Sequence, residues 1–490
     1  MDELTAQRVA KLEQLRALGI DPYPTRARRT HTAAAAVAIV DALPEGQSES
    51  GEAVHVAGRI VAKRDQGKVT FLDLLDATGR IQVMLRVNQI GEAAYDALRL
   101  TDLGDFIGVE GMPMRTRAGQ PTVAAANWTM LTKALHAPPE KFHGLADAEL
   151  RQRRRYLDLM ANEETRRTFS ARSRAISAIR RFLDARGFLE VETPILHESE
   201  SGAAARPFTT HFNAIDEDRV LRISLELHLK RLVIGGFDRV YEIGRNFRNE
   251  GMSFKHNPEF TMMETYEAYA DYHQVAEMVE QMLSSVAIEV LGTTKVTFRE
   301  QAIDLAPPWR RVTMHDAMRE YGGPDLDLFD NAGALRAELR RRGVDAAATA
   351  GYGKLVDEAM SHYIEPNLIQ PTFLLDYPVE LSPLAKRKPD NPRLVERWEV
   401  FFAGFEFGNA YTELNDPIDQ RSRFDDQTAL RAAGDDEAEM IDEDFLFALE
   451  HGMPPTGGFG MGIDRFIMLL TGQSSIREVI LFPPHKTVKE

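Results

Sequence analysis

The 490-residue sequence contains no cysteine, which excludes disulfides, thiolate metal sites and cysteine nucleophiles. It has no apolar run long enough to cross a bilayer, and its N-terminal segment lacks the apolar core of a signal peptide. A GxxxxGK(S/T) phosphate loop is also absent, which argues against a P-loop nucleotide site. We therefore expect a cytoplasmic protein with no membrane attachment.

Net positive charge is lacking too. The formal net charge of −16 argues against a chain built mainly to coat nucleic acid. Local basic patches can still bind RNA, and RQRRR at 151–155 is a candidate, with a solvated helix face as the alternative. The remaining composition, 43% hydrophobic and 27% charged, is typical of a globular protein, and the length indicates at least two domains.

Changes in composition and periodicity divide the chain into four segments. We expect an N-terminal helical extension over residues 1–50, a barrel over 51–140, a linker over 141–165 and a larger domain over 166–490. The larger domain is rich in strands and contains a polar, helical insertion at about 300–365.

Short alternating segments cut by glycine-containing turns begin near Val54. About five such strands within roughly 90 residues predict an OB-fold, whose strand face and loops bind oligonucleotides. A small barrel without a ligand is the alternative.

The first polar cluster in the larger domain lies at residues 240–266. VYEIGRNFRNEG and EFTMMETYEAY are two strands that could pair antiparallel around a polar turn. Side-chain alternation places Glu264 and Tyr266 on one face, together with Phe260, where they could receive a cationic group. Arg248, beside the turn, can form two hydrogen bonds to a carboxylate or phosphate. A surface hairpin with incidental charges is the alternative.

The second cluster is ERWEVFFAGFEFGNAYTELN. Its aromatic residues favour strands, and alternation places Asn409, Tyr411 and Glu413 on one face. Glu406 joins them only if the chain bulges near Gly408. Buried carboxylates need cations, and Mg²⁺ readily bridges carboxylates to phosphates.

The third cluster, PPTGGFGMGIDRFIMLLTG, is a glycine-rich segment that leads into an apolar helix. Its glycines allow close approach of the backbone to a ligand, and Arg465 could stack on a base through its planar guanidinium. A tight turn without a ligand is the alternative.

Three segments resemble, in this order, the three motifs of class II aminoacyl-tRNA synthetases. They are the helix and strand ending at Pro194, FRNEG with EFTMMETYEAY, and GMGIDRFIML. The preceding barrel resembles the subclass with an N-terminal anticodon-binding OB-fold, and strings such as ARPFTT, NAYTELNDP and LEHGMPPTGGFGMGIDR resemble its lysyl branch in bacteria. The resemblance implies an α+β catalytic domain, with an antiparallel sheet flanked by helices, and a homodimer formed through residues 170–195.

The resemblance also implies roles for individual residues. The catalytic arginines would be Arg248 and Arg465. The residues that would contact ATP are Arg248, Glu250, His256, Asn257, Phe260, Glu399, Glu406 and Arg465, with Glu399 and Glu406 also holding Mg²⁺. The expected lysine pocket, which includes Tyr411 from the alternation, is Gly202, Glu226, Arg248, Glu264, Tyr266, Asn409, Tyr411 and Glu413. In the barrel, Arg64, Phe71 and Gln82 would read the anticodon of tRNA(Lys).

The implied activity is the ATP-dependent activation of L-lysine to lysyl-adenylate, followed by transfer of lysine to the 3′-end of tRNA(Lys). One alternative keeps the enzyme but changes the substrate, to aspartate, asparagine or a protein. Glu413 and Glu226 argue against an acidic side chain in the pocket. Another alternative is a non-enzymatic RNA-binding module, but such a protein would be expected to have lost part of the catalytic set.

Overall fold

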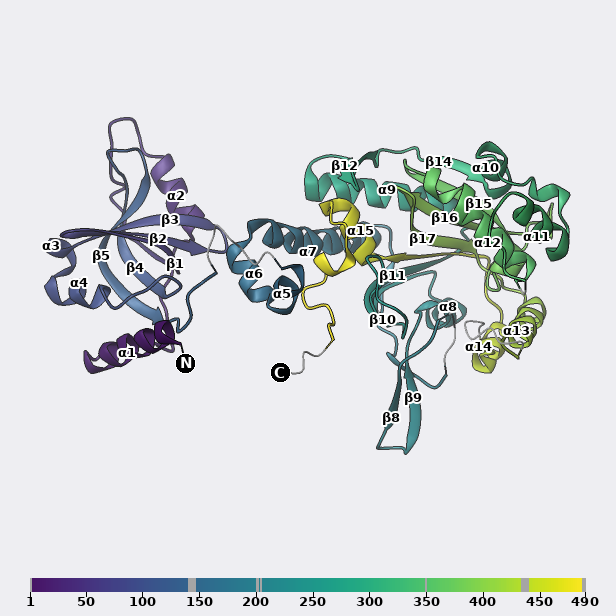
Figure 1. Ribbon diagram of the computed structural model, residues 1–490, viewed down its shortest axis with the longest axis horizontal. Helices are drawn as coiled ribbons and strands as arrows, with labels where there is room; N and C mark the ends of the chain where they lie inside the picture. Colours follow the sequence, from purple (N-terminus) through teal and green to yellow (C-terminus); the bar gives the residue numbers. More distant parts are fainter. Residues whose placement is uncertain are drawn as a thin grey trace. The chain divides into compact units, whose positions relative to one another are not determined.

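The computed structural model describes residues 2–139, 147–199, 202, 205–348, 350–432 and 440–486. The chain divides into two compact units, Met1–Ala146 and Asp147–Glu490 (Figure 1). No helix of the described residues is long and apolar enough to cross a membrane. The expected linker at 141–165 lies partly outside the described residues, and its remainder from 147 onward is helical and counts with the second unit.

The first unit contains the OB-fold that the sequence predicts. Its strands form a closed barrel in the order β1-β2-β3-β5-β4. They are β1 (Val54–Gln66), β2 (Val69–Asp76), β3 (Gly79–Arg86), β4 (Phe106–Arg115) and β5 (Pro121–Thr132). The barrel closes around alternate apolar side chains such as Leu72, Val83 and Ile107, which are fully buried.

Helices of the N-terminal segment pack on this barrel. They are α1 (Glu3–Ala17) and α2 (Ala33–Asp41), and α3 (Val87–Ile90) and α4 (Glu92–Leu98) follow β3. Asp2 and Thr32 cap α1 and α2 by accepting backbone N–H groups. Leu15 of α1 and Ala36 of α2 are part of the barrel's hydrophobic core. Residues 2–50 thus contain two helices joined by irregular segments, and they belong to the same compact unit as the barrel.

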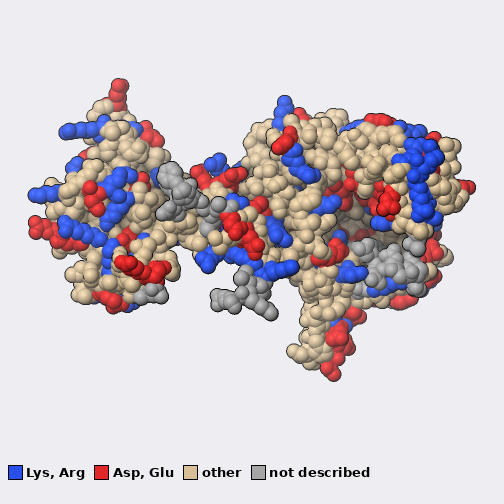
Figure 2. Space-filling view, viewed as in Figure 1, with Lys and Arg blue, Asp and Glu red and all other residues tan. Residues whose placement is uncertain are grey.

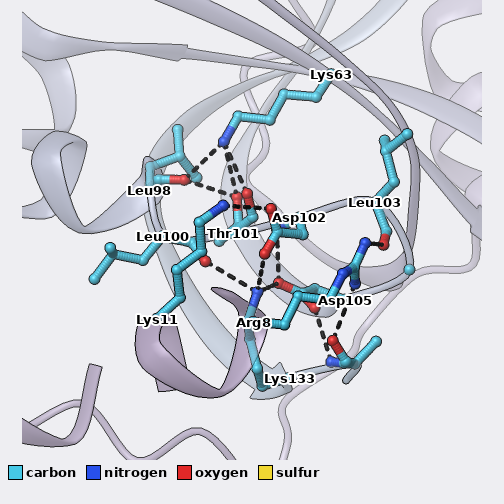
Figure 3. A network of polar contacts seen from close by, with 12 residues as sticks. Arg8, Lys11, Lys63, Leu98, Leu100, Thr101, Asp102, Leu103, Asp105 and Lys133 are labelled. Carbon is cyan, nitrogen blue, oxygen red and sulfur yellow. Dashed lines mark hydrogen bonds and ion pairs between the residues drawn. The ribbon is translucent and has the colours of Figure 1, made fainter. Parts of the chain in front are cut away.

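A buried polar network fastens α1 to the barrel (Figure 3). The Lys133 ammonium is fully buried and donates to Asp102 at 2.6 Å, Asp105 at 2.8 Å and the Leu100 carbonyl at 3.0 Å. Lys11 of α1 reaches the other oxygen of Asp102 at 2.5 Å. Each charge in this network has an opposite charge in contact with it, which offsets the cost of burial.

The second unit is built on a mixed, mainly antiparallel sheet. In the described residues the strand order is β14-β15-β16-β17-β18-β11-β10-β6. The strands are β14 (Arg310–Thr313), β15 (Thr372–Pro378), β16 (Leu394–Phe402), β17 (Phe405–Thr412), β18 (Thr456–Gly462), β11 (Glu259–Ala268), β10 (Arg239–Phe247) and β6 (Leu189–Glu190). The end pairs β14–β15 and β10–β6 are parallel.

The two faces of this sheet differ. Helices α7 (Glu163–Asp184), α9 (Tyr272–Leu291) and α15 (Ile463–Thr471) share one apolar core with Met263, Trp398 and other strand residues. The opposite face carries Tyr266, against which α8 (Glu226–Ile234) and α14 (Glu443–Leu449) pack in a smaller cluster. Figure 1 shows α9 and α8 on opposite sides of the strands. The second face is left partly open, which creates room for a ligand.

The predicted insertion at about 300–365 is only partly helical. Its helices are α10 (Met314–Glu320), η1 (Leu326–Leu328), α11 (Ala332–Arg341), α12 (Tyr352–Tyr363) and η2 (Glu365–Asn367). The earlier residues form the end of a hairpin, β12 (Lys295–Phe298) and β13 (Gln301–Asp304), and the edge strand β14. The prediction missed β14 because it is four residues long and begins with two exposed arginines, so no alternation is visible.

The remaining elements complete the second unit. They are α5 (Ala148–Arg153), α6 (Arg155–Ala161), β7 (Leu196–His197), β8 (Thr209–Phe212), β9 (Glu217–Leu221), η3 (Val379–Leu381), α13 (Pro417–Ala432) and η4 (Ile476–Glu478). The strand expected in FLEVETPIL is shorter than predicted, since only Leu189 and Glu190 pair with β10. Residues 433–439 lie outside the described residues, and α14 starts at Glu443 with Asp442 as its cap.

Candidate active site

The hairpin of β10 and β11 forms the centre of the open face. The two strands pair antiparallel along their whole length, with Val240 opposite Tyr266 and Glu242 opposite Glu264. Alternation on β11 turns Met263 into the core and sends Glu264 and Tyr266 to the other side. The local pattern of the sequence therefore places a carboxylate and a phenol side by side on a largely buried surface.

A bulge in β17 brings Glu406 to the same side. The pairing register of β16 and β17 shifts between Val400–Gly408 and Phe401–Glu406, which leaves Phe407 as the additional residue. Glu406 and Asn409 consequently line the same cavity, although their parity in a regular strand would differ. This is the bulge near Gly408 that the sequence analysis required if Glu406 was to join the cluster.

Glycines on β18 leave the space that the polar side chains fill. Alternation puts Phe459 and Met461 in the core and turns Gly458 and Gly460 to the open face. A Cβ atom at Gly458 would lie 1.9 Å from Oε1 of Glu413 and 2.6 Å from the Tyr266 ring, so any side chain there would displace these two groups. The glycine-rich segment is therefore needed for close approach of the Glu413 carboxylate to the sheet.

The first of two neighbouring cavities has a volume of about 870 Å³ and opens to solvent. Its walls contain all but one of the residues for which the resemblance implies ATP contact: Arg248, Glu250, His256, Asn257, Phe260, Glu406 and Arg465. Arg465, at the start of α15, donates to the backbone carbonyl of Glu406 at 2.8 Å. The Arg248 guanidinium lies 5.3 Å from the centre of the Phe260 ring. An aromatic face and two arginines suit a planar base with attached phosphates.

The second cavity, of about 1180 Å³, is rich in carboxylates. The structure brings together here every residue expected for lysine: Gly202, Glu226, Arg248, Glu264, Tyr266, Asn409, Tyr411 and Glu413. Arg248 and Asn409 line both cavities, so a ligand group held at Arg248 can reach from one into the other. Glu226, Glu264 and Glu413 are 8%, 4% and 1% exposed, and burial of this kind demands positive partners.

The carboxylates of the second cavity are held in different ways. Glu264 accepts the backbone N–H of Leu225 at 3.2 Å and the hydroxyls of Ser224 and Tyr266 at 3.3 and 3.1 Å. Burial, and then the charge of Glu226, raises the pKa of Glu264 to about 7. Burial likewise raises the pKa of Glu413 above its ordinary value. A cationic ligand would favour the ionised form of both groups.

A buried cation lies behind two carboxylates of this cavity and was not predicted from the sequence. Lys230 of α8 is fully buried, with its ammonium 2.6 Å from Oε1 of Glu226 and 2.5 Å from Oε2 of Glu413. Its contact with Glu413 is an ion pair rather than a well-aligned hydrogen bond, and Glu413 Oε1 has no partner in the described residues. The four-residue spacing between Glu226 and Lys230 on a helix was the available signal.

The structure differs from expectation at Glu399. This residue does not line either cavity. Its carboxylate accepts the Tyr377 hydroxyl at 2.9 Å and pairs with Arg397, a second buried cation that the sequence analysis overlooked. No group of three or more His, Cys, Asp or Glu side chains placed to hold a metal occurs in the described residues. Glu406 is more open, with its side chain 41% exposed.

The barrel brings its three predicted residues onto one face. Arg64 pairs with Phe71 across β1 and β2, and Asp73 pairs with Gln82 across β2 and β3. Since Phe71 and Asp73 are two residues apart, all four side chains point the same way. Arg64 donates to Asp73 at 2.8 Å, and Phe71 is half-buried. Figure 2 shows basic and acidic side chains intermingled over this unit, rather than one basic field.

This fold and site define a class of enzyme. Residues 147–486 match the family model of class II tRNA synthetases (D, K and N), and residues 54–131 match that of an OB-fold nucleic acid binding domain. The chain thus belongs to the class II tRNA synthetases.

Full-length relatives narrow the class. A lysine--tRNA ligase of Dehalococcoides mccartyi is 53% identical over 484 residues, which cover 99% of this chain and 97% of the relative. Lysine--tRNA ligases of Moorella thermoacetica and Roseiflexus castenholzii are 51% and 52% identical, over 100% and 99% of this chain and 99% and 98% of their own lengths. Within its class, the chain belongs to the family of lysine--tRNA ligases.

Proposed function

We propose that the chain activates L-lysine with ATP, forming lysyl-adenylate and pyrophosphate, and then transfers lysine to the 3′-end of tRNA(Lys). The observation that carries this proposal is the meeting of two cavities at Arg248, one lined by Phe260 and Arg465 and the other by buried carboxylates. A nucleotide fits the first description, and a molecule with two ammonium groups fits the second.

The proposed roles follow the positions of the side chains. Adenine would lie between the Phe260 ring and Arg465, while Glu250, His256 and Asn257 contact the nucleotide. Burial, and then the charge of Arg465, lowers the pKa of His256, so the imidazole is neutral at pH 7 and adds no positive charge. The α-ammonium of lysine would be bound by Glu226 and the Gly202 backbone, and the ε-ammonium by Glu413 and Tyr266.

The first step is an in-line attack of the lysine carboxylate on the α-phosphorus of ATP, with pyrophosphate leaving. Arg248 would hold both the carboxylate and the α-phosphate through its forked guanidinium. Placement of the two reactants and neutralisation of charge provide the rate, and the site requires no general base for this step. In the second step, the 3′-terminal hydroxyl of tRNA attacks the lysyl carbonyl and AMP leaves.

Mg²⁺ is the proposed cofactor, and the two expected ligands fit it unequally. Glu406 lines the first cavity and keeps an exposed carboxylate. Glu399 would need to release Arg397 or Tyr377 to contribute an oxygen. Bound there, the ion would offset the negative charge of the ATP phosphates.

The barrel face would recognise the tRNA. We propose that Phe71 stacks on an anticodon base while Arg64 and Gln82 read its edge. Asp73, which holds Arg64 at 2.8 Å, would fix the direction of that arginine.

Because its product is consumed in translation, we propose that the enzyme acts in the cytoplasm.

A homodimer is proposed through the segment 170–195. This segment contains most of α7 and the edge strand β6. Leu189 and Ile195 are 46% and 44% exposed there, as is the adjacent Leu196 at 45%, which is unusual for large apolar side chains at a sheet edge. Light scattering should give twice the chain mass of 55.1 kDa. A monomer at micromolar concentration would contradict this assembly.

Amino-acid-dependent exchange of pyrophosphate into ATP tests the activation step. We expect exchange with L-lysine and not with the other nineteen standard amino acids, in the absence of tRNA. Exchange with aspartate or asparagine would contradict the proposed pocket while keeping the enzyme class. A folded protein that binds ATP but exchanges with no amino acid would contradict the whole proposal.

A further inference from the structure

Lys230 places a positive charge against two carboxylates, Glu226 and Glu413, that line the second cavity. Its side chain has 0% exposure, and it lies between Glu226 of its own helix and Glu413 at the end of β17. A cation at this position competes for the same carboxylates that a substrate ammonium would use. Its presence therefore needs an explanation beyond helix packing.

The charges of the cavity give that explanation. Three buried carboxylates, Glu226, Glu264 and Glu413, surround one resident ammonium, since Arg397, another cation at this cavity, is paired with Glu399. When all three carboxylates are ionised, two negative charges remain uncompensated. L-lysine carries two ammonium groups, and its carboxylate is matched separately by Arg248. With lysine bound, the three carboxylates and the three ammonium groups are equal in number. Without the charge of Lys230, one carboxylate would be left over, which is costly in a dry site.

We propose that Lys230 is a positioning residue that sets the charge of the amino-acid cavity, so that the cavity matches a substrate with two ammonium groups. This inference rests on the proposed binding of lysine in the second cavity. Lys230 also restricts geometry, since it holds Oε2 of Glu413 and leaves Oε1 without a partner in the described residues. The substrate ε-ammonium is thereby directed to one oxygen.

The surroundings of Lys230 support a permanent charge. Around the two glutamates lie Glu264 and Tyr266 of β11 and Tyr411 of β17, and the Phe445 ring of α14 lies 5.9 Å from the ammonium. Burial alone would lower the pKa of Lys230, but the charges of Glu226 and Glu413 raise it above its ordinary value. The ammonium thus stays protonated at every pH at which the enzyme works.

The pH dependence of lysine binding tests this inference. Calorimetric titration of L-lysine into the full-length protein between pH 6 and pH 9 gives the affinity at each pH. The wild-type affinity should rise with pH and then level off, as the buried carboxyl groups become ionised. In Lys230→Met the affinity should level off about one pH unit higher or more, because carboxyl groups that have lost their cation hold their protons more tightly. The KM for lysine should rise about 30-fold or more in Lys230→Met, with a smaller change in kcat.

Two further variants make the result specific. Lys230→Arg retains the charge and should restore the wild-type pH profile of lysine binding. Lys133→Met, which removes an equally buried ammonium from the barrel, should leave that profile unchanged.

The outcomes are distinguishable. A Lys230→Met protein whose lysine affinity follows the wild-type pH profile would overturn the inference and leave the proposed function intact. If that variant does not fold, the wild-type protein decides with L-norleucine, which lacks the ε-ammonium. Above the pH at which the lysine affinity levels off, the norleucine affinity should fall with pH, and an affinity that stays level would show that the cavity is not matched to two ammonium groups. Failure of the wild-type protein to exchange with lysine would instead overturn the proposed function.

Discussion

Each unit of the molecule buries a lysine ammonium between two carboxylates, but the two clusters differ in what remains unsatisfied. In the barrel, Lys133 has three acceptors, two of them the carboxylates of Asp102 and Asp105 (Figure 3). The second oxygen of Asp105 accepts the N–H of Ala134 at 2.8 Å. In the second unit, Lys230 also contacts two carboxylates, yet Oε1 of Glu413 has no partner in the described residues.

The difference separates a structural use of buried charge from a binding use. A network whose carboxylates are all satisfied fixes one arrangement of the elements around it, here α1 against the barrel. A network with an acceptor left over holds its carboxylates in place without saturating them. The same residue types can therefore stabilise a fold or prepare a ligand site, and only the partners of each oxygen distinguish the two.

The largest effect is expected in the barrel cluster. Lys133→Met would leave the carboxylates of Asp102 and Asp105 buried together without their shared cation, which should cost about 3–5 kcal/mol of unfolding free energy. Urea unfolding of the full-length protein would measure this loss. Lysine-dependent pyrophosphate exchange should continue under conditions where the variant is folded. A variant as stable as the wild-type protein would contradict a structural role for this cluster.

Loss of a charge in the Lys230 cluster (Glu226, Lys230 and Glu413) should weaken lysine binding more than it lowers the stability of the fold. Glu413→Gln removes the charge that the substrate ε-ammonium requires, and we expect a loss of about 2–5 kcal/mol in lysine recognition. The exchange assay, run over a range of lysine concentrations, measures it. Asp105→Asn is the matched control, since it neutralises a buried carboxylate beside Lys133 in the barrel. Lysine activation unchanged in Glu413→Gln would refute the pocket assignment.

A smaller effect is expected on the outer face of the barrel. Phe71→Ala removes the proposed stacking surface and should weaken tRNA recognition by about 1–3 kcal/mol. Aminoacylation kinetics with varied tRNA(Lys) measure this loss, and exchange without tRNA in the same variant serves as the control. Charging of tRNA at the normal rate would exclude Phe71 from the anticodon site and separate the barrel's surface role from that of its buried cluster.

The sequence alone predicted the parts of this molecule that depend on local pattern. Alternation predicted the barrel strands and the β10–β11 hairpin. The opposite parity of Glu406 made its place in the cluster depend on a bulge near Gly408, and the structure contains that bulge in β17. The short strand β14 was missed because four residues cannot display a period. Such edge strands form through pairing with a neighbour, here β15, that is distant in the sequence.

The residues of the site could be predicted from the sequence, but their ion pairs could not. Motif resemblance named the side chains around both cavities, but it could not indicate which carboxylate already has a cation. Lys230 lies far in sequence from Glu413, and their ion pair depends on a tertiary contact. Arg397 lies only two residues from Glu399 on β16, so its ion pair is local but carries no signal in the motif. Glu399 shows the consequence, because its neighbour Arg397 occupies the carboxylate that resemblance assigns to a metal.

The smallest expected effect is that of pH on lysine affinity and on stability, for which the carboxyl groups near Lys230 and near Lys133 differ. The pKa of Glu264 is raised to about 7, so this group is protonated below that pH and ionised above it. Because lysine needs ionised carboxylates, its affinity should rise with pH up to about 7 and then level off, by about tenfold per pH unit for one proton. In the barrel, although burial opposes it, hydrogen bonds from Lys11 and Lys133 lower the pKa of Asp102.

The raised pKa of Glu264 and the lowered pKa of Asp102 predict opposite dependences of the free energy of unfolding on pH. A carboxyl group with a raised pKa binds its proton more tightly in the folded state, so the contribution of Glu264 to stability falls as pH rises from its ordinary value through about 7. Asp102 contributes stability that is lost only as pH falls through its lowered pKa. Added lysine should therefore raise the melting temperature more at pH 8 than at pH 6, by about the affinity difference. An equal shift at both values would mean that Glu264 is already ionised in the empty cavity.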